Sequence, residues 1–99
     1  MAIQLHVGAP ASVATDQQGA FIIRAESLGF SGVGVADDAR YADPFVTLAA
    51  AASVTSRLWL YPAVTNPMTR TSGAQAKAIQ ALSEKAPGRV KLAIGTGDA

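Results

Sequence analysis

The 99-residue sequence contains no cysteine, which excludes a disulfide framework and any thiolate metal site, and no metal site is predicted. Charged side chains make up only 15% of the residues, below the share of about 25% that is usual for a soluble domain. Their net charge is +1 and their positions are scattered, so the chain lacks the basic patch of a nucleic-acid-binding protein and no nucleic-acid partner is expected. So few charges on so short a chain indicate surfaces that meet other parts of a larger protein.

Long apolar runs are also missing. No stretch reaches the ~18 residues that a transmembrane helix needs, and the segment 1–7 lacks the basic start and apolar core of a signal peptide. We therefore expect a cytoplasmic protein with no membrane partner. The hydrophobic share of 49% supplies one modest core, and the length allows at most one domain.

Short apolar segments alternate with longer segments of helical periodicity along the whole chain. The predicted strands are 3–7, 32–35, 58–63 and 90–94, and the predicted helices are about 15–28, 44–54 and 73–85. Successive strands begin about 30 residues apart, the length of one strand–helix unit. Helices between strands this short require parallel pairing, because each crossover must return the chain to the same end of the sheet.

Residues typical of helix ends mark several of these boundaries. Thr15 stands three residues before Gln18, which is the spacing of a capping box. Gly29 follows the first helix as a C-terminal cap, because glycine adopts the left-handed conformation at little cost. Asp43 is followed by Pro44, a pair that caps and begins the second helix. These signals support the predicted helices.

Two folds fit four parallel strands in this order. One is an open doubly wound sheet, and the other is an eight-stranded (β/α)8 TIM barrel, of which the chain would be the N-terminal half. The loop 8–12 lacks the G-x-G-x-x-G pattern of a pyrophosphate-binding turn, which favours the barrel. We expect residues 1–99 to form a single partial barrel domain, truncated after the fourth strand, and this piece alone to be inactive.

In either fold, reactive groups belong on the loops after the carboxyl ends of the strands. Asp37 and Asp38 follow the second strand, Thr65 and Asn66 follow the third, and Asp98 follows the fourth. Because parallel strands end at the same edge of a sheet, these polar groups should converge around one mouth.

Four other residues have a structural interpretation. Arg70 stands just before the third helix, an unfavourable place for a cation, and needs a partner such as the Asp43 carboxylate or a ligand. His6 is interpreted as a satisfied interior histidine, with a substrate-side group as the alternative. Trp59 and Tyr61 are interpreted as core or helix-packing residues.

Four segments resemble one enzyme family in order and spacing. They are 25–33 (AESLGFSGV), 43–52 (DPFVTLAAAA), 64–70 (VTNPMTR) and 87–98, which begins PGRV and ends GTGD. They are similar to segments of the bacterial-luciferase-like oxidoreductases. The VTNP segment with its following arginine resembles the coenzyme F420-dependent branch of that family, which is typified by methylenetetrahydromethanopterin reductase.

The resemblance implies a (β/α)8 barrel that holds coenzyme F420 or FMN at the carboxyl ends of its strands. Hydride would pass between the ring and a small organic substrate, or reduced FMN would meet oxygen in a monooxygenase. The residues implied to bind the cofactor are Asp37, Ala63, Val64, Thr65, Asn66 and Gly97, and those implied to be catalytic are Asp37 and Asp98. A non-proline cis peptide bond is implied at Ala63–Val64, and a homo-oligomer is expected for the full-length form.

One position departs from the family pattern. Relatives commonly have Asp-His where this chain has Asp37 and Asp38. Histidine exchanges protons near neutral pH, whereas an unperturbed aspartate, with a pKa of about 3.9, is only an acceptor there. Proton transfer at this position is therefore not expected.

Two rival interpretations remain open. The chain could be a non-catalytic half-barrel that dimerises or docks on a partner, with its open sheet edges covered. It could also belong to another TIM-barrel enzyme that handles phosphorylated metabolites, which would share the fold but not the VTNP segment. Size-exclusion or scattering data that show a well-folded homodimer with cooperative unfolding would favour the half-barrel.

Overall fold

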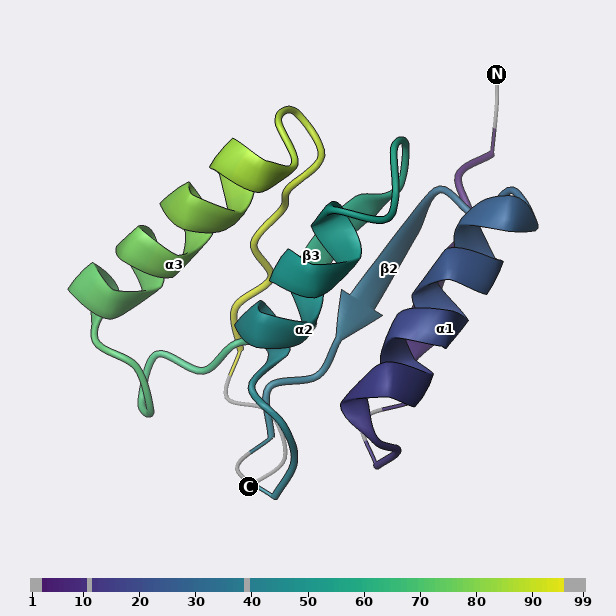
Figure 1. Ribbon diagram of the computed structural model, residues 1–99. Helices are drawn as coiled ribbons and strands as arrows, with labels where there is room; N and C mark the ends of the chain where they lie inside the picture. The colour runs from purple at the N-terminus through teal and green to yellow at the C-terminus, as the bar shows by residue number, and fades with distance from the viewer. Residues whose placement is uncertain (1–2, 11, 39, 96–99) are drawn as a thin grey trace.

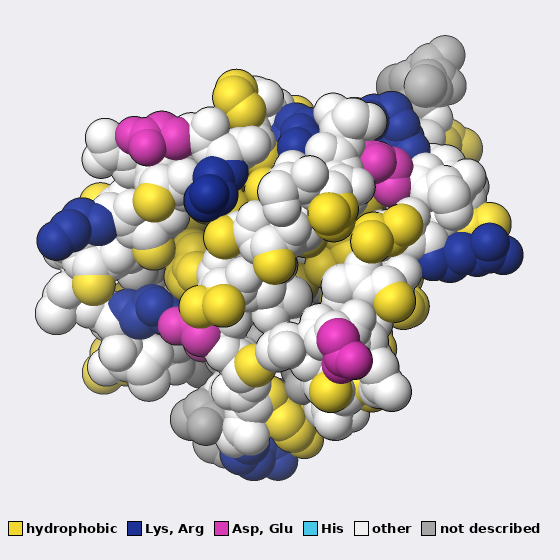
Figure 2. All heavy atoms as spheres, in the orientation of Figure 1, with side chains coloured by type: hydrophobic (Ala, Val, Ile, Leu, Met, Phe, Trp, Pro, Cys, Tyr) yellow, Lys and Arg dark blue, Asp and Glu magenta, His cyan; other side chains and the backbone are white. Residues whose placement is uncertain are grey.

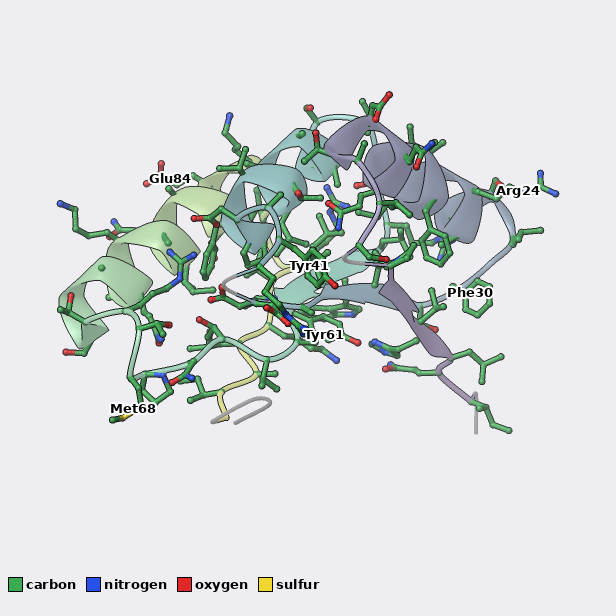
Figure 3. The ribbon with its side chains drawn as sticks, turned by 90° about the horizontal axis from the view of Figure 1, so that it is seen from below. Arg24, Phe30, Tyr41, Tyr61, Met68 and Glu84 are labelled. Carbon is green, nitrogen blue, oxygen red and sulfur yellow. The ribbon has the colours of Figure 1, made fainter. Side chains whose placement is uncertain are left out.

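The computed structural model of the protein describes residues 3–10, 12–38 and 40–95. Strands and helices alternate in the order β1 (His6–Ala9), α1 (Thr15–Ser27), β2 (Gly32–Val35), α2 (Pro44–Ala52), β3 (Trp59–Pro62) and α3 (Ser72–Lys85). The strands pair in parallel in the order β1-β2-β3, and the three helices lie side by side in front of them (Figure 1). Figure 3 shows these helices on one side of the sheet only. A doubly wound sheet carries helices on both faces, so the arrangement is that of a partial TIM barrel, as predicted.

The segment after α3 runs beside β3, but it does not form the regular fourth strand that was predicted for 90–94. Leu60 bridges Val90 and Thr65 bridges Ile94, both in parallel. Between these bridges the first segment advances from 60 to 65 and its partner only from 90 to 94, so the first has one residue more. Such an extra residue is a β-bulge, which bends the strand and interrupts the ladder. The predicted parallel direction of segment 90–94 and its place beside β3 are confirmed, whereas the prediction of a regular strand there is wrong.

The first strand also begins later than predicted. The alternation of apolar residues suggested a start at residue 3, but Ile3 and Leu5 are 84% and 61% exposed and precede β1. The first residue pair between β1 and β2 joins His6 to Gly32. Residues before His6 have no strand residue opposite them, because β2 itself begins at Gly32.

The predicted capping box at the start of α1 is wrong. Ala14 occupies the N-cap position and no side chain caps the helix there. The Gln18 side chain is buried instead, where its Nε2 donates to the Pro10 carbonyl oxygen at 3.1 Å. Its Oε1 accepts a hydrogen bond of 3.1 Å from Thr47 Oγ1. Gln18 therefore ties α1 to the loop after β1 and to α2.

The other predicted helix signals are confirmed. Gly29 has a φ of +91°, and the amides of Gly29 and Phe30 donate to the carbonyls of Glu26 and Ala25, which is a Schellman motif. The Asp43 carboxylate accepts from the amide of Phe45 at 2.8 Å at the start of α2. These two signals fix where α1 ends and where α2 begins.

The core lies between the sheet and the helices. Its fully buried large apolar residues are Ile22, Val33, Leu48, Leu58 and Leu60, each 0% exposed. Burying a side chain of this kind is worth about 1.5–3 kcal/mol. Figure 2 shows apolar side chains in the furrows between the helices, with charges of both signs scattered over this face. None of the described helices is long and apolar enough to cross a bilayer.

Glu26 joins α1 to the segment that leads into β3, at the end of the sheet opposite the predicted mouth. Its Oε2 accepts hydrogen bonds from the amides of Ser56, Arg57 and Leu58 at 2.8–3.0 Å. Burial raises the pKa of Glu26, but these amides and the Arg57 charge outweigh it and leave the pKa below its ordinary value of 4.5. The carboxylate is thus held in its ionised form.

Replacing Glu26 by glutamine is expected to lower the free energy of unfolding by about 1 kcal/mol. The loss is this small because solvent reaches the carboxylate and screens its charge. The lowered pKa makes this contribution complete above pH 4.5 and lost as the pH falls through the folded-state value. Chemical denaturation at pH 7 and in acid measures both effects. Glu84→Gln, on an exposed side chain of α3 that points outward in Figure 3, should change stability by under about 0.5 kcal/mol.

Candidate functional site

The carboxyl ends of the three strands lie level with one another. Ala9, Val35 and Pro62 are register partners, so the loops that follow them leave the sheet at one edge. This edge, called the rim below, is at the bottom of Figure 1, where the loops after β2 and β3 gather. The predicted convergence is confirmed for the loops after β2 and β3, whereas Asp98 of the predicted fourth loop lies outside the described residues.

Two of the predicted site residues contact each other at the rim. Thr65 Oγ1 donates to Asp37 Oδ2 at 2.9 Å. Thr65 is 0% exposed, and its hydroxyl also accepts from Gln75 Nε2 of α3 at 3.5 Å. A threonine hydroxyl that donates once and accepts once has its orientation set by both partners. The loops after β2 and β3 are therefore connected to α3 through one buried hydroxyl group.

Arg70 completes this network as a clamp between three elements. Its Nε lies 3.0 Å from Asp37 Oδ2 and its Nη2 lies 2.9 Å from Asp43 Oδ2. Its guanidinium carbon lies 4.8 Å from the centroid of the Phe45 ring. Burial raises the pKa of Asp43, but Arg70 and the Phe45 amide outweigh it and keep the pKa below its ordinary value. The predicted partner Asp43 is confirmed, and Asp37 is a second one.

Asp38 does not join Asp37 at this network. Its carboxylate binds Arg40, with Oδ2 2.8 Å from Nη2 and Oδ1 accepting from the Arg40 amide at 2.9 Å. These side-chain and backbone hydrogen bonds lower the pKa of Asp38 to about 2. Asp38 is therefore ionised at neutral pH and has no proton to give.

The bulge after β3 lies beside small residues. The Ala63–Val64 peptide bond is cis, as the resemblance implied. A Cβ atom added at Gly34 would lie 2.7 Å from the Ala63 Cβ, and one added at Gly95 would lie 3.2 Å from Val64 Cγ2. Ala63 is exposed and Val64 is half-buried. Gly34 and Gly95 leave no room for larger side chains on either side of the bulge. The bulge therefore presents a shallow apolar surface.

Buried polar residues recur at the fourth position of each described helix. Gln18, Thr47 and Gln75 hold this place in α1, α2 and α3. They are 1%, 4% and 6% exposed, and each hydrogen-bonds a loop or a neighbouring helix just below the rim. Buried polar groups need such partners. The recurrence was visible in the sequence only once the helix starts were known.

Three predicted site residues remain, which are Asn66, Gly97 and Asp98. Asn66 lies at the rim, where its Oδ1 accepts from the Met68 amide at 2.7 Å. Gly97 and Asp98 lie outside the described residues. Sequence reasoning did not place Arg70 or Gln75 in the site, although the misplaced cation before α3 was a signal for the first.

Two hollows lie on the helical face, and the one between α2 and α3 reaches the rim network, because Asp43, Phe45 and Arg70 also line it. One of about 400 Å³ lies between α2 and α3 and is lined mainly by apolar residues, among them Val46, Ala49 and Leu82. Another of about 380 Å³ lies between α1 and α2. Each is a furrow between packed helices, and the hydrogen-bonded rim network remains the candidate site.

Three comparisons with known proteins bear on this arrangement. Residues 2–99 match the luciferase-like monooxygenase family. A 5,10-methylenetetrahydromethanopterin reductase of Methanolobus tindarius is 36% identical over 74 residues, which are 75% of this chain and 23% of that protein. The coenzyme F420-dependent tetrahydromethanopterin reductase of Methanopyrus kandleri matches with a TM-score of 0.92 and 27% identity, over 97% of this chain and 28% of that one.

An F420-dependent secondary alcohol dehydrogenase, solved with an F420–acetone adduct, matches with a TM-score of 0.80 and 26% identity. The match covers 94% of this chain and 32% of that one. The chain thus spans between about a quarter and a third of the length of these relatives.

Proposed function

Because the chain belongs to the luciferase-like monooxygenase family, we propose that its rim is one wall of the cofactor pocket of an F420- or FMN-dependent oxidoreductase. The full-length protein would transfer hydride between the cofactor and a small organic substrate. In this proposal residues 1–99 are part of a single (β/α)8 barrel, and the full-length protein is a homo-oligomer. The observation that carries the proposal is the joining of Asp37 to Thr65 beside the bulge at Ala63 and Val64.

The residues at the rim fit a flat, fused-ring cofactor. Such a ring needs a shallow apolar surface against one face and polar groups at its edge. Ala63 and Val64 offer the surface, since Gly34 and Gly95 keep larger side chains away from it. The polar groups at its border come from the Asp37–Thr65 pair.

The described residues would hold and orient the cofactor. Ala63 and Val64 would support the ring, Asn66 would contact its polar edge, and the buried Thr65 would hold the Asp37 carboxylate in place. Asp37, whose Oδ2 already accepts from Thr65 and Arg70, would act from its carboxylate as a fixed negative group. Gly97 and Asp98 would complete this wall, the second as a carboxylate beside the cofactor. The bound cofactor supplies the hydride chemistry, which no side chain can supply.

A fluorescence titration of the full-length protein with F420 and with FMN tests the proposal. We expect one of the two to bind, and a protein that binds neither would contradict it. Thr65→Val should weaken that binding about tenfold, because it removes the hydroxyl between Asp37 and Gln75 while keeping the side-chain shape. Thr15→Val, on an exposed threonine of α1, should leave the affinity unchanged.

A further inference from the structure

The sheet face opposite the helices carries a polar pair that the proposed cofactor contacts do not use. His6 of β1 and Tyr61 of β3 meet across β2, with imidazole Nδ1 2.9 Å from the Tyr61 hydroxyl oxygen. Their ring centroids are 5.6 Å apart. Figure 3 places Tyr61 near the face that the helices leave open. The interpretation of Tyr61 as a helix-packing residue is therefore wrong, because the residues of β3 that reach the core are Leu60 and Pro62.

Two glycines of β2 leave the room that this pair occupies. A Cβ atom at Gly32 would lie 2.6 Å from His6 Nδ1, and one at Gly34 would lie 2.9 Å from Tyr61 Cε2. Both distances are shorter than packed atoms tolerate, so a side chain at either position would push the rings away. The Gly-Val-Gly sequence of β2 is thus matched to the pair that crosses it.

The surroundings of His6 suit one direction for its bond to Tyr61. The other imidazole nitrogen, Nε2, lies 3.5 Å from Gln4 Oε1. In the tautomer that carries its proton on Nε2, Nδ1 accepts from the Tyr61 hydroxyl. Burial raises the pKa of Tyr61, so its hydroxyl stays protonated at neutral pH. In that tautomer Tyr61 is a hydroxyl donor with a proton acceptor directly behind it.

Tyr61, the member of the pair on β3, lies next to the proposed cofactor surface. The position of an added Cβ at Gly34 is 2.7 Å from the Ala63 Cβ as well as 2.9 Å from the Tyr61 ring, so both side chains border the same space. At the rim itself, Asp38 is bound to Arg40 and ionised, and Asp37 already accepts two hydrogen bonds on Oδ2. The Thr65 hydroxyl beside the bulge is fully buried and donates to Asp37, whereas Tyr61 is half-buried and its hydroxyl contacts an imidazole.

Resting on the proposed function, we propose that Tyr61 and His6 transfer the proton that accompanies hydride transfer, and that the substrate reacts at a carbon bonded to oxygen. When an alcohol is oxidised, its C–H bond gives hydride to the cofactor and its O–H bond gives a proton to a base, which leaves a carbonyl group. The substrate proton passes to the Tyr61 oxygen while the Tyr61 proton passes to His6 Nδ1, which forms imidazolium. Reduction of a carbonyl returns both along the same path.

The first test measures the tautomer of His6 by nitrogen-15 NMR of the full-length protein labelled at histidine. His6 is the only histidine among residues 1–99, and His6→Asn identifies its signals if the rest of the protein has others. We expect the Nε2-protonated form in the parent and a mixture of both tautomers in Tyr61→Phe. Tyr41→Phe removes the same hydroxyl from an exposed tyrosine and should change nothing. An unchanged tautomer in Tyr61→Phe would overturn the pairing.

The second test uses the cofactor-loaded protein with acetone, cyclohexanone and their alcohols as probes. We expect at least one probe to shift the His6 signals and to be turned over, and Tyr61→Phe to lower kcat about 100-fold with cofactor affinity within about twofold of the parent. Tyr41→Phe should keep the parent kcat. If cofactor binds but no probe shifts His6, or Tyr61→Phe keeps the parent kcat, this inference is wrong and the proposed function stands. If neither F420 nor FMN binds, the proposed function fails and the catalytic role of the pair fails with it.

Discussion

Replacing Arg70 by methionine is expected to lower the free energy of unfolding by about 2–3 kcal/mol. The side chains of Arg70 and Asp37 are only 22% and 14% exposed, so the change leaves a carboxylate in a partly buried place without its counterion. Breaking a fully buried pair costs about 3–5 kcal/mol, and the loss is smaller here because the other partner, Asp43, is 44% exposed. Methionine keeps most of the apolar stem, so the loss reports on the guanidinium. Chemical denaturation at pH 7 measures it.

Acid should reduce the difference between this variant and the parent. Arg70 helps to hold the pKa of Asp43 below its ordinary value of 3.8, against the effect of burial. A lowered folded-state pKa gives stability that is complete above that ordinary value and is lost as the pH falls through the folded-state value. The two denaturation curves should therefore approach each other below about pH 4.

Two further substitutions distinguish the paired hydrogen bonds of Arg70 to Asp37 and Asp43 from its positive charge alone. Arg24→Met removes an exposed arginine of α1 and should cost under about 0.5 kcal/mol. Arg70→Lys keeps the charge but cannot reach both carboxylates in the same fork geometry, so an intermediate loss is expected. Equal stabilities of the Arg70 and Arg24 variants would show that Arg70 holds nothing together.

The sequence predicted the fold where local pattern and tertiary packing agree. β2 was placed correctly, since its four residues are apolar or glycine and all are buried. The capping box failed because Thr15 and Gln18 fit two structures, a cap and a buried cross-link. The contact that decides between them is made by Thr47, which lies 29 residues further on. Local spacing carries no information about such a partner.

The site divides in the same way. The loops of the rim followed from parallel pairing alone, and the position of the cis bond at Ala63–Val64 followed from the resemblance. The alternation of Trp59 and Tyr61 with leucines could not show which set faces the helices, because both faces of the strand carry large apolar groups. The pairing of Tyr61 with His6 spans 55 residues and depends on the register of three strands. Only the three-dimensional structure shows that register.

Gly34→Ala should destabilise the protein by about 1–3 kcal/mol and disturb the proposed cofactor surface. The added methyl group would lie 2.7 Å from the Ala63 Cβ and 2.9 Å from Tyr61 Cε2. Real Cβ atoms do not approach other atoms this closely, so β2 or the bulge must move. In the full-length protein the same variant should weaken binding of F420 or FMN, because Ala63 is part of the proposed support for the ring.

The chain offers a matched control and a rescue for this substitution. Gly8 is the register partner of Gly34 on β1, yet a Cβ atom there would have nothing within 4 Å, so Gly8→Ala should cost under about 0.5 kcal/mol. Ala63→Gly removes the nearer of the two obstacles. If the contact with Ala63 causes the loss, the double variant Gly34→Ala with Ala63→Gly recovers part of it, and the double-mutant cycle gives a favourable coupling. If Gly34→Ala is as stable as Gly8→Ala, the close approach of β2 to the bulge does not exist in solution, and the packing argued for both the ring support and the Tyr61–His6 pair fails.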